Sequence, residues 1–284
     1  MAKIIDGKKI SAAVRDGVKA EVEILKQQGI NTCLAVIIVG DDPASKIYVA
    51  NKERACEYTG IESRKYALPA DTKMEDLLAL IDELNNDKTV NGILCQLPLP
   101  KGLDEKRVIE AISPQKDVDA FCHENVGKIM TGEYDFLPCT PAGIMEMLAY
   151  EGIDPAGKNC VVIGRSNIVG KPMGMLLLHK NGTVTICHSR TRDLKEVTKR
   201  AEILVSAVGR ANFVTADMVG EGAVVIDVGM NRDEQGKLCG DVAYDEVEKI
   251  ASAITPVPGG VGPMTIAVLM KNTLTAAKRQ NNLN

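Results

Sequence analysis

Short apolar runs alternate along the chain with longer stretches in which apolar residues recur at helical spacing. Runs of about four to eight apolar residues predict buried strands, and the helical spacing predicts helices with one apolar face. The predicted strands are Cys33–Val39, Glu62–Ala67, Gly92–Gln96, Asn159–Ile163, Thr183–Cys187, Ile203–Ala207 and Val224–Val228. The predicted helices are Gly7–Gln28, Ala44–Thr59, Met74–Asn85, Pro141–Tyr150, Val169–His179, Leu194–Lys199 and Pro263–Lys278. Strands that alternate with helices predict an α/β fold with a parallel sheet.

The segment Asp135–Pro141, which contains two prolines, interrupts this alternation near the middle of the chain. Proline removes a backbone donor and restricts the residue before it, so such a stretch marks a boundary between domains. We therefore expect two α/β lobes with a cleft between them, residues 1–139 and residues 140–263, the second Rossmann-like. The C-terminal helix, residues 264–284, is expected to complete the first lobe. A cleft between lobes is a common place for a small-molecule site.

Composition narrows the class of partner. The 284 residues carry 34 basic and 38 acidic side chains, a net charge of −4, and 3% aromatic residues, which argues against nucleic acid. Apolar runs fall far short of the ~20 residues that span a bilayer, so we expect a cytoplasmic protein without membrane contact. Of the eight cysteines and three histidines, only two Cys-His pairs are adjacent, and their spacing does not match zinc sites. We therefore expect no metal.

The stretch from Cys160 to Arg190 has the order of a nucleotide-binding unit: strand, glycine turn, helix and second strand. Gly164 permits a tight turn, and the following helix offers N–H groups to a phosphate. The segment departs from the strict GxGxxG pattern, because Ser166 stands in place of the second glycine. An ordinary turn between a strand and a helix, without a nucleotide, therefore stays an alternative. Ser189 and Arg190, however, stand where an NAD site places an acid on the ribose. A hydroxyl beside a guanidinium suits a 2′-phosphate, which predicts NADP.

Three polar residues of the first lobe share one face of a predicted helix. Ser45, Tyr48 and Lys52 are spaced by three and four positions. A lysine near a tyrosine in a half-apolar cleft can exchange protons, although a solvated surface lysine would show the same spacing. The Tyr-x-x-x-Lys spacing also matches short-chain dehydrogenases, but there the pair follows the glycine loop, whereas here it precedes it.

Three further segments carry groups suited to a ligand. Gln96, at the end of a predicted strand in Gln96–Pro100, can offer both a donor and an acceptor. Asp119 stands in a loop, where it could bind an amino-substituted heterocycle or simply cap a turn. The glycine-rich run Pro258–Pro263 lets backbone approach a ligand closely, or forms a tight turn between lobes. None of the three decides a function by itself.

In order along the chain, these motifs resemble the bifunctional methylenetetrahydrofolate dehydrogenase/methenyltetrahydrofolate cyclohydrolase family. The matching runs are Ile4–Gly7, Gly40–Ser45, Tyr48–Lys52, Gln96–Pro100, Lys116–Asp119, Gly164–Pro172, Cys187–Arg190 and Pro258–Pro263, and they span essentially the whole chain. The resemblance implies oxidation of 5,10-methylenetetrahydrofolate by NADP, followed by hydrolysis of the methenyl product to 10-formyltetrahydrofolate. It also implies a homodimer that acts on tetrahydrofolate derivatives.

The resemblance further implies roles for individual residues. Four would be catalytic: Lys52 at the centre, Tyr48 stacked on the folate, Gln96 assisting Lys52, and Asp119 binding the pterin. The folate cleft would also be lined by Cys95, Leu97, Pro258, Gly259, Gly260, Val261 and Gly262. NADP would be held by Gly164, Arg165, Ser166, Ser189 and Met230, beside Arg190. After Asp119 the family has glycine, and Ala120 here disfavours a positive φ, which predicts a shifted loop.

The chemistry of the two reactions suits these residues. Hydride loss from the methylene compound leaves a cation shared by two nitrogens and releases no hydroxyl proton, so positioning suffices. Adding water to that cation requires proton transfer, which gives Lys52 a task. Two alternatives stay open on the sequence alone. One is an NADP-dependent dehydrogenase of a small alcohol that uses Tyr48 and Lys52, and the other is a non-enzymatic NADP-binding sensor.

Overall fold

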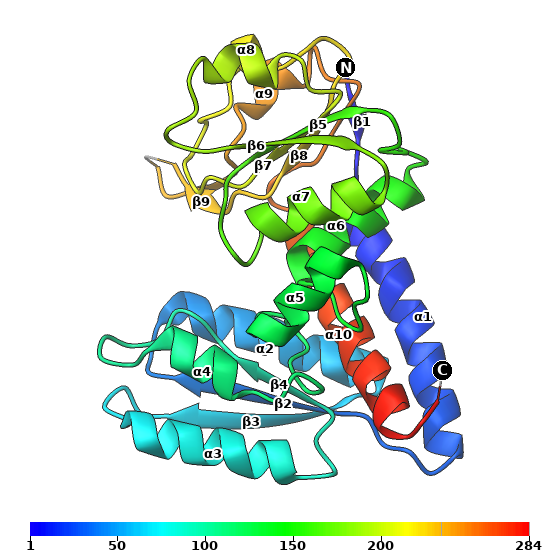
Figure 1. Cartoon of the computed structure of the whole chain (residues 1–284), viewed down its shortest axis with the longest axis vertical. Coiled ribbons are helices and arrows are strands. Elements are labelled where there is room, and N and C mark those ends of the chain that lie inside the picture. Colours follow the sequence, from blue (N-terminus) through cyan, green and yellow to red (C-terminus); the bar gives the residue numbers. More distant parts are fainter. Residues whose placement is uncertain (234, 284) are drawn as a thin grey trace. The chain divides into compact units, whose positions relative to one another are not determined.

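The structure, a computed structural model, describes residues 1–233 and 235–283 and consists of two compact units (Figure 1). Unit 1 comprises Met1–Ser11 and Cys139–Thr265, and unit 2 comprises Ala12–Pro138 and Ile266–Asn284. This division differs from the expected one at the N-terminus, where residues 1–11 were assigned to the other lobe. The N-terminal residues belong to unit 1 because strand β1 (Lys3–Ile4) pairs in parallel with β11 (Ala253–Ile254) in the sheet of that unit.

Unit 2 is built on a three-stranded parallel sheet in the order β3-β2-β4. Every residue of the central strand β2 (Cys33–Val39) is buried, as its uninterrupted apolar run predicts. The edge strands are β3 (Glu62–Leu68) and β4 (Gly92–Cys95). The helices within this unit are α2 (Pro43–Thr59), α3 (Met74–Asn86), α4 (Glu105–Ala111) and α5 (His123–Thr131). Leu77, Ile81 and Leu84 of α3 pack with the strands into one apolar core.

Unit 1 is built on a six-stranded sheet in the order β1-β11-β8-β7-β5-β6, and every neighbouring pair is parallel. Its inner strands are β5 (Asn159–Ile163), β7 (Ile203–Ser206) and β8 (Val224–Asp227), and β6 (Thr183–Cys187) is an edge. Its helices are α6 (Cys139–Tyr150), α7 (Gly170–His179), α8 (Leu194–Thr198), α9 (Tyr244–Val247) and the 3₁₀ turn Ala216–Met218. The chain passes from β5 to β6 on one side and then to β7 on the other. Such a reversal opens a ligand crevice at the carboxyl ends of the strands.

A separate antiparallel hairpin of unit 1 joins β9 (Asn231–Arg232) to β10 (Leu238–Cys239). The strands of this hairpin, like β1 and β11, are two residues long. Two residues cannot show an alternating pattern, so these strands were not predicted from the sequence. The longer strands β2, β5 and β6 have the predicted bounds.

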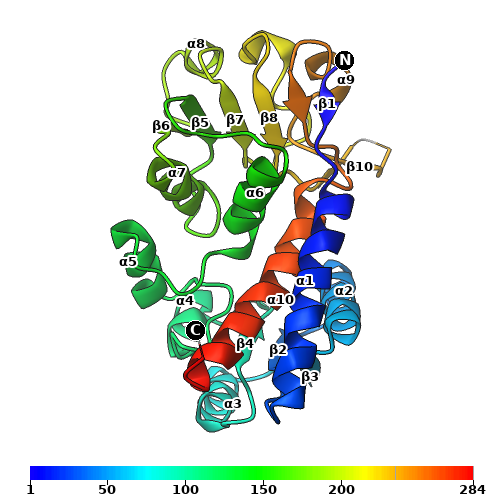
Figure 2. The ribbon, with the colours of Figure 1, turned by 90° about the vertical axis from the view of Figure 1, so that its right-hand side faces the viewer.

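Two long helices, α1 (Gly7–Gln27) and α10 (Val261–Gln280), begin in unit 1 and continue into unit 2. Figures 1 and 2 show them side by side, and an ion pair joins Lys278 to Glu21. Within unit 2, the Asn272 amide of α10 donates hydrogen bonds to the carbonyl oxygens of Val118 (2.8 Å) and Leu137 (2.9 Å). From Ile266 onward the C-terminal helix is therefore an integral part of unit 2. No helix among the described residues is long and apolar enough to cross a membrane.

Candidate active site and cofactor cradle

Lys52 and Gln96 meet through their side chains in unit 2. Lys52 lies on α2, and Gln96 directly follows β4. The Nζ of Lys52 donates a hydrogen bond of 2.9 Å to the Oε1 of Gln96. The Nε2 of Gln96 donates to the carbonyl oxygen of Leu97 at 2.6 Å. Because its nitrogen is engaged by the backbone, the amide presents its oxygen to the lysine. The structure thus joins two residues that the sequence predicted to act together.

The helix that carries Lys52 has a well-defined start. Asp42 accepts a hydrogen bond of 2.7 Å from the backbone N–H of Ser45, and these N-terminal hydrogen bonds lower the pKa of its carboxyl. Ser45 itself is buried, whereas Tyr48, one turn further on, is 37% exposed. Burial raises the pKa of the Tyr48 phenol, so it stays protonated at neutral pH. Its ring is partly exposed, and an aromatic ring of this kind can stack on a flat ligand.

Cys95, the last residue of β4, lies close to charges from several segments. Burial is the main reason that the pKa of its thiol is raised to about 12; the carboxylates of Glu105 and Asp119 add to the rise, and Lys52 opposes it. A thiol with this pKa is protonated and is a poor nucleophile. The opposing influences also show that Asp119 and Lys52 both lie within electrostatic reach of this one sulfur. Lys52 and Gln96 therefore meet beside Cys95 at the end of β4, and Asp119 belongs to the same unit.

The loop that carries Asp119 is held by its buried neighbour Asp117. The Asp117 carboxylate accepts hydrogen bonds from the backbone N–H of Cys122 (2.9 Å) and the amide of Asn125 (3.0 Å). Burial raises the pKa of this carboxyl, and the two hydrogen bonds oppose the rise. Ala120, which was expected to avoid a positive φ, has a φ of 57°. That expectation was wrong, because the surrounding contacts outweigh a local cost of about 1 kcal/mol.

The carboxyl ends of β5, β6 and β7 surround a cavity of about 280 Å³ in unit 1. It is lined by Ile163, Gly164, Arg165, His188, Ser189, Leu194, Ala207, Val208, Arg210 and Phe213. Gly164 has a φ of 131°, and a Cβ there would lie 2.4 Å from the carbonyl oxygen of Ala207. A Cβ at Gly170 would lie 2.2 Å from the carbonyl oxygen of Gly164. Only glycine fits at either position, so the residues form a cradle in which backbone can approach a dinucleotide.

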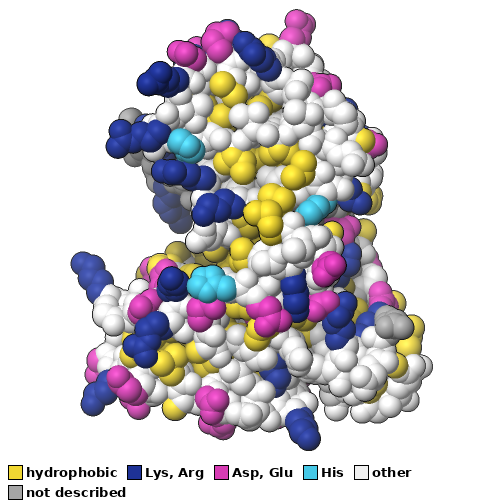
Figure 3. All heavy atoms as spheres, in the orientation of Figure 1, with side chains coloured by type: hydrophobic (Ala, Val, Ile, Leu, Met, Phe, Trp, Pro, Cys, Tyr) yellow, Lys and Arg dark blue, Asp and Glu magenta, His cyan; other side chains and the backbone are white. Residues whose placement is uncertain are grey.

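Hydroxyl and basic groups surround this cradle. The Oγ of Ser166 accepts from the backbone N–H groups of Val169 (3.2 Å) and Gly170 (3.3 Å) at the start of α7. Ser189 lines the cavity, whereas Arg190 is an exposed neighbour whose backbone N–H donates to the Nδ1 of His188 at 3.1 Å. Figure 3 shows basic side chains and a histidine gathered along one edge of unit 1. Arg165 and Arg210 line the cavity itself, and their guanidinium groups suit the phosphates of a nucleotide.

Arg210 is a basic lining residue that the sequence reasoning missed. Its Cζ lies 4.9 Å from the centroid of the Phe213 ring. A guanidinium over an aromatic face is a stabilising cation–π arrangement, so the side chain has a defined place beside the cavity. No motif marked Arg210 in the sequence. The signal that could have found it is its place directly after the predicted strand Ile203–Ala207 and the small residues that follow.

The predicted segment Pro258–Gly262 lies in unit 1, whereas Lys52 and Gln96 lie in unit 2. A Cβ at Gly7 would lie 1.8 Å from the carbonyl oxygen of Gly260, so the start of α1 packs directly on this segment. Met230 is 47% exposed, and its Sδ lies 3.7 Å from the place of a Cβ at Gly262. Met230 therefore lies beside this segment and does not line the 280 Å³ cavity.

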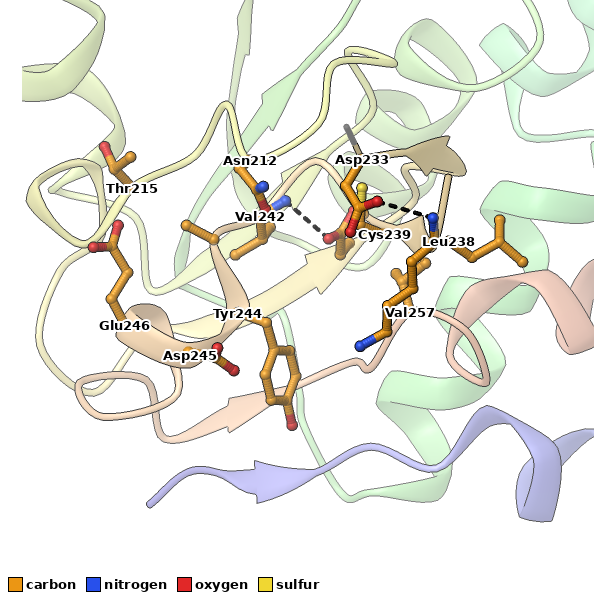
Figure 4. Close-up of a pocket in the computed structure, with 14 residues that line it drawn as sticks. Asn212, Thr215, Asp233, Leu238, Cys239, Val242, Tyr244, Asp245, Glu246 and Val257 are labelled. Carbon is orange, nitrogen blue, oxygen red and sulfur yellow. Dashed lines mark hydrogen bonds between the residues drawn. The ribbon is translucent and has the colours of Figure 1, made fainter. Parts of the chain in front are cut away.

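A second cavity of unit 1, about 670 Å³, lies at the hairpin and α9. Figure 4 shows Asp233, Leu238 and Cys239 of the hairpin segment together with Tyr244 and Asp245 of α9. None of the site residues predicted from the sequence is among its described lining residues. Across the part of the chain that the structure describes, no three histidine, cysteine or carboxylate side chains are grouped so that they could hold a metal ion.

Comparisons with known proteins match both units. Residues 5–119 match the family model described as the catalytic domain of tetrahydrofolate dehydrogenase/cyclohydrolase, and residues 138–281 match its NAD(P)-binding domain. The chain is 61% identical over 279 residues to the bifunctional protein FolD of Acetivibrio thermocellus, with 98% of each chain covered.

Solved structures give the same result. The FolD methylenetetrahydrofolate dehydrogenase/cyclohydrolase of Campylobacter jejuni superposes with a TM-score of 0.97 and 49% identity, covering 98% of this chain and 99% of that one. The Trypanosoma brucei dehydrogenase-cyclohydrolase, solved with NADP and an inhibitor, superposes with a TM-score of 0.93 and 37% identity, covering 98% of each. This chain therefore belongs to the tetrahydrofolate dehydrogenase/cyclohydrolase family.

Proposed function

We propose how this bifunctional enzyme, a methylenetetrahydrofolate dehydrogenase (NADP⁺) and methenyltetrahydrofolate cyclohydrolase, divides its two reactions among its residues. The first reaction oxidises 5,10-methylenetetrahydrofolate to 5,10-methenyltetrahydrofolate, and the second hydrolyses that product to 10-formyltetrahydrofolate. The observation that carries the proposal is the 2.9 Å hydrogen bond from the Nζ of Lys52 to the Oε1 of Gln96. It supports a proton-transferring amine held at one place in unit 2.

In the dehydrogenase reaction, the residues of this chain bind and orient. NADP, when bound, supplies the hydride acceptor. The residues proposed to hold it are Gly164, Arg165, Ser166, Ser189, Arg190 and Met230. Gly164 lets the backbone approach the cofactor, while Arg165 and Ser189 line the cavity and Arg190 stands beside it. The substrate loses hydride without losing a hydroxyl proton, so orientation of the two reactants carries this step.

In the cyclohydrolase reaction, Lys52 moves a proton. Water attacks the methenyl carbon, a C–O bond forms, and the amine of Lys52 takes the proton that the water releases. As the bond from that carbon to one ring nitrogen breaks, the remaining hydroxyl proton is released to solvent and the C=O bond of the formyl group forms, while the proton held by Lys52 passes to the nitrogen that leaves. Gln96 keeps the amine in line, because its oxygen accepts from Nζ while its own nitrogen is held by the backbone.

The folate itself would be held by residues around Lys52. Tyr48 offers a half-exposed ring for stacking, and Asp119 offers a carboxylate that can accept from the amino group of the pterin. Cys95 ends β4 and Leu97 lies two residues further on, and they would line the site as small and apolar groups. Pro258, Gly259, Gly260, Val261 and Gly262 belong to unit 1, and their proposed role in folate binding rests on the family resemblance alone.

The family resemblance also supports a cytoplasmic homodimer. Light scattering of the purified protein tests its oligomeric part, because a dimer has twice the chain mass of 30.5 kDa. A mass equal to a single chain over the working concentration range would contradict this part of the proposal.

One spectrophotometric assay tests the proposed reactions together. Methylenetetrahydrofolate and NADP are mixed with the enzyme, and NADPH and the methenyl chromophore are followed in the same sample. We expect NADPH to accumulate while the methenyl signal stays low, because its hydrolysis follows. Methenyltetrahydrofolate supplied without NADP isolates the second reaction. Oxidation of small alcohols without folate turnover would favour the Tyr48/Lys52 alcohol dehydrogenase instead, and tight NADP binding without any turnover would favour a sensor.

A further inference from the structure

A fully buried carboxylate, Asp241, holds the turn that follows β7. It lies just after the β9–β10 hairpin and is 0% exposed. Its oxygens accept from the three consecutive backbone N–H groups of residues 208–210, at 2.7, 3.3 and 2.9 Å. They also accept from the Oγ of Ser206 (3.2 Å) and the Nδ2 of Asn231 (2.9 Å). All five partners donate, so the group at this place has to be an acceptor only.

A second carboxylate fixes the backbone of Asp241. Asp227, at the end of β8, accepts from the backbone N–H groups of Gly229 (2.8 Å), Asp241 (2.9 Å) and Val242 (2.9 Å). A Cβ at Gly229 would lie 2.4 Å from an Asp241 oxygen, and one at Gly240 would lie 1.8 Å from an Asp227 oxygen. The two carboxylates are therefore closely enclosed by backbone, and Asp241 has one defined position.

The turn that Asp241 holds is a wall of the cofactor cradle. Ala207, Val208 and Arg210 all line the 280 Å³ cavity. The carbonyl oxygen of Ala207 is also the atom that a Cβ at Gly164 would approach to 2.4 Å, so this turn packs on the glycine turn. Asn231, the other partner of Asp241, directly follows Met230. A single carboxylate thus connects two of the segments that would hold NADP.

We propose that Asp241 is a positioning residue for NADP, holding the turn at residues 207–210 and the segment at Asn231 in the shape that binds the cofactor. This role rests on the proposed NADP site. Under this proposal Asp241 affects the dehydrogenase reaction and not the hydrolysis, because Lys52 and Gln96, which are proposed to carry out the hydrolysis, belong to the other unit. An acceptor-only group is needed, since the amide nitrogen of an asparagine would face N–H groups without a partner.

The test compares Asp241→Asn with Asp245→Asn, the same chemical change at an exposed position on α9. NADP binding is measured directly by calorimetry, and the two reactions are measured separately. For Asp241→Asn we expect the Kd and KM for NADP to rise about tenfold, with kcat at saturating NADP reduced less. Hydrolysis of supplied methenyltetrahydrofolate should stay within about twofold of the unaltered enzyme. Asp245→Asn should match the unaltered enzyme in all measurements.

A folded Asp241→Asn variant with an unchanged Kd for NADP would overturn the inference, as would an equal loss of both reactions. If Asp241→Asn does not fold, Asn231→Ala removes one donor and leaves the carboxylate in place. We expect this variant to raise the Kd for NADP about threefold, and an unchanged Kd would overturn the inference. Absence of NADP binding by the unaltered chain would overturn the proposed function together with this inference. Equal binding by unaltered and variant proteins would overturn the inference alone.

Discussion

The two units build their candidate sites from different parts of the chain. In unit 2 the site consists of side chains, with Lys52, Gln96 and Asp119 supplying the amine, amide and carboxylate. In unit 1 the cradle consists largely of backbone turns, held by the buried carboxylates of Asp227 and Asp241. Changes of functional group should therefore damage the unit 2 reaction most, and changes of backbone shape should damage cofactor binding. The comparison can be tested because each reaction has its own assay.

The largest effect is expected from Lys52→Met, which keeps the length of the side chain and removes its amine. Loss of the proton-transferring group should lower the cyclohydrolase rate about a thousandfold, while the Kd for NADP stays unchanged. The decay of the methenyl chromophore measures the rate. Lys46→Met is the matched control, since Lys46 lies on the same helix and is paired with Asp41. Undiminished hydrolysis by Lys52→Met would contradict the claim that the reaction in unit 2 depends on the functional group of this side chain.

A backbone change in unit 1 should have the converse effect. Gly164→Ala places a Cβ 2.4 Å from the carbonyl oxygen of Ala207, at a φ of 131°. We expect the Kd for NADP to rise about thirtyfold, with hydrolysis of supplied methenyltetrahydrofolate retained. Gly222→Ala is the control, because it also has a positive φ of 79° but no atom within 4 Å of the added Cβ. Equal NADP affinities of the two variants would contradict a close backbone contact at Gly164.

Cofactor choice should depend on side chains even in unit 1. Arg190→Ala removes a guanidinium beside the cavity, so binding of NADP should weaken about tenfold while binding of NAD is nearly unchanged. Arg200→Ala removes the same charge from another exposed position of this unit and should not alter the ratio of the two affinities. Titrations with both dinucleotides give that ratio. An equal loss of NAD and NADP affinity in Arg190→Ala would refute the 2′-phosphate contact.

The smallest effect is expected from Asp227, one of the two buried carboxylates that hold the backbone turns of unit 1, and it concerns the free energy of unfolding. Burial raises the pKa of Asp227 from 3.8 to about 6, so the folded protein keeps this proton to a higher pH than the unfolded chain does. The stabilisation is fully present below about pH 4 and is lost as the pH rises through about 6. In Asp227→Asn this contribution is absent. Urea unfolding of the unaltered protein and of Asp227→Asn between pH 4 and 7 measures this contribution. If the unfolding free energies of the two proteins change in parallel with pH, Asp227 does not have a raised pKa.

Sequence reasoning found the side-chain site more completely than the backbone cradle. Lys52 and Gln96 belong to motifs whose residue types indicate their chemistry, and the structure joins their side chains by a hydrogen bond, whereas the role of Asp119 stays a prediction. The roles of Asp241 and Asp227 depend on donors that each carboxylate receives from two separate segments, and no local sequence pattern indicates that these segments meet. Ala120 shows the same limit, because tertiary contacts impose a conformation that the residue alone disfavours.

The pairing of β1 with β11 sets an order of events during synthesis. β1 leaves the ribosome before its partner, Ala253–Ile254, which follows about 250 residues later. This pair in the unit 1 sheet can therefore form only after residue 254 has been synthesised. Since the chain crosses between the units after residues 11, 138 and 265, neither unit is one continuous length of polypeptide. Exchange of a whole unit between relatives would need three junctions rather than one.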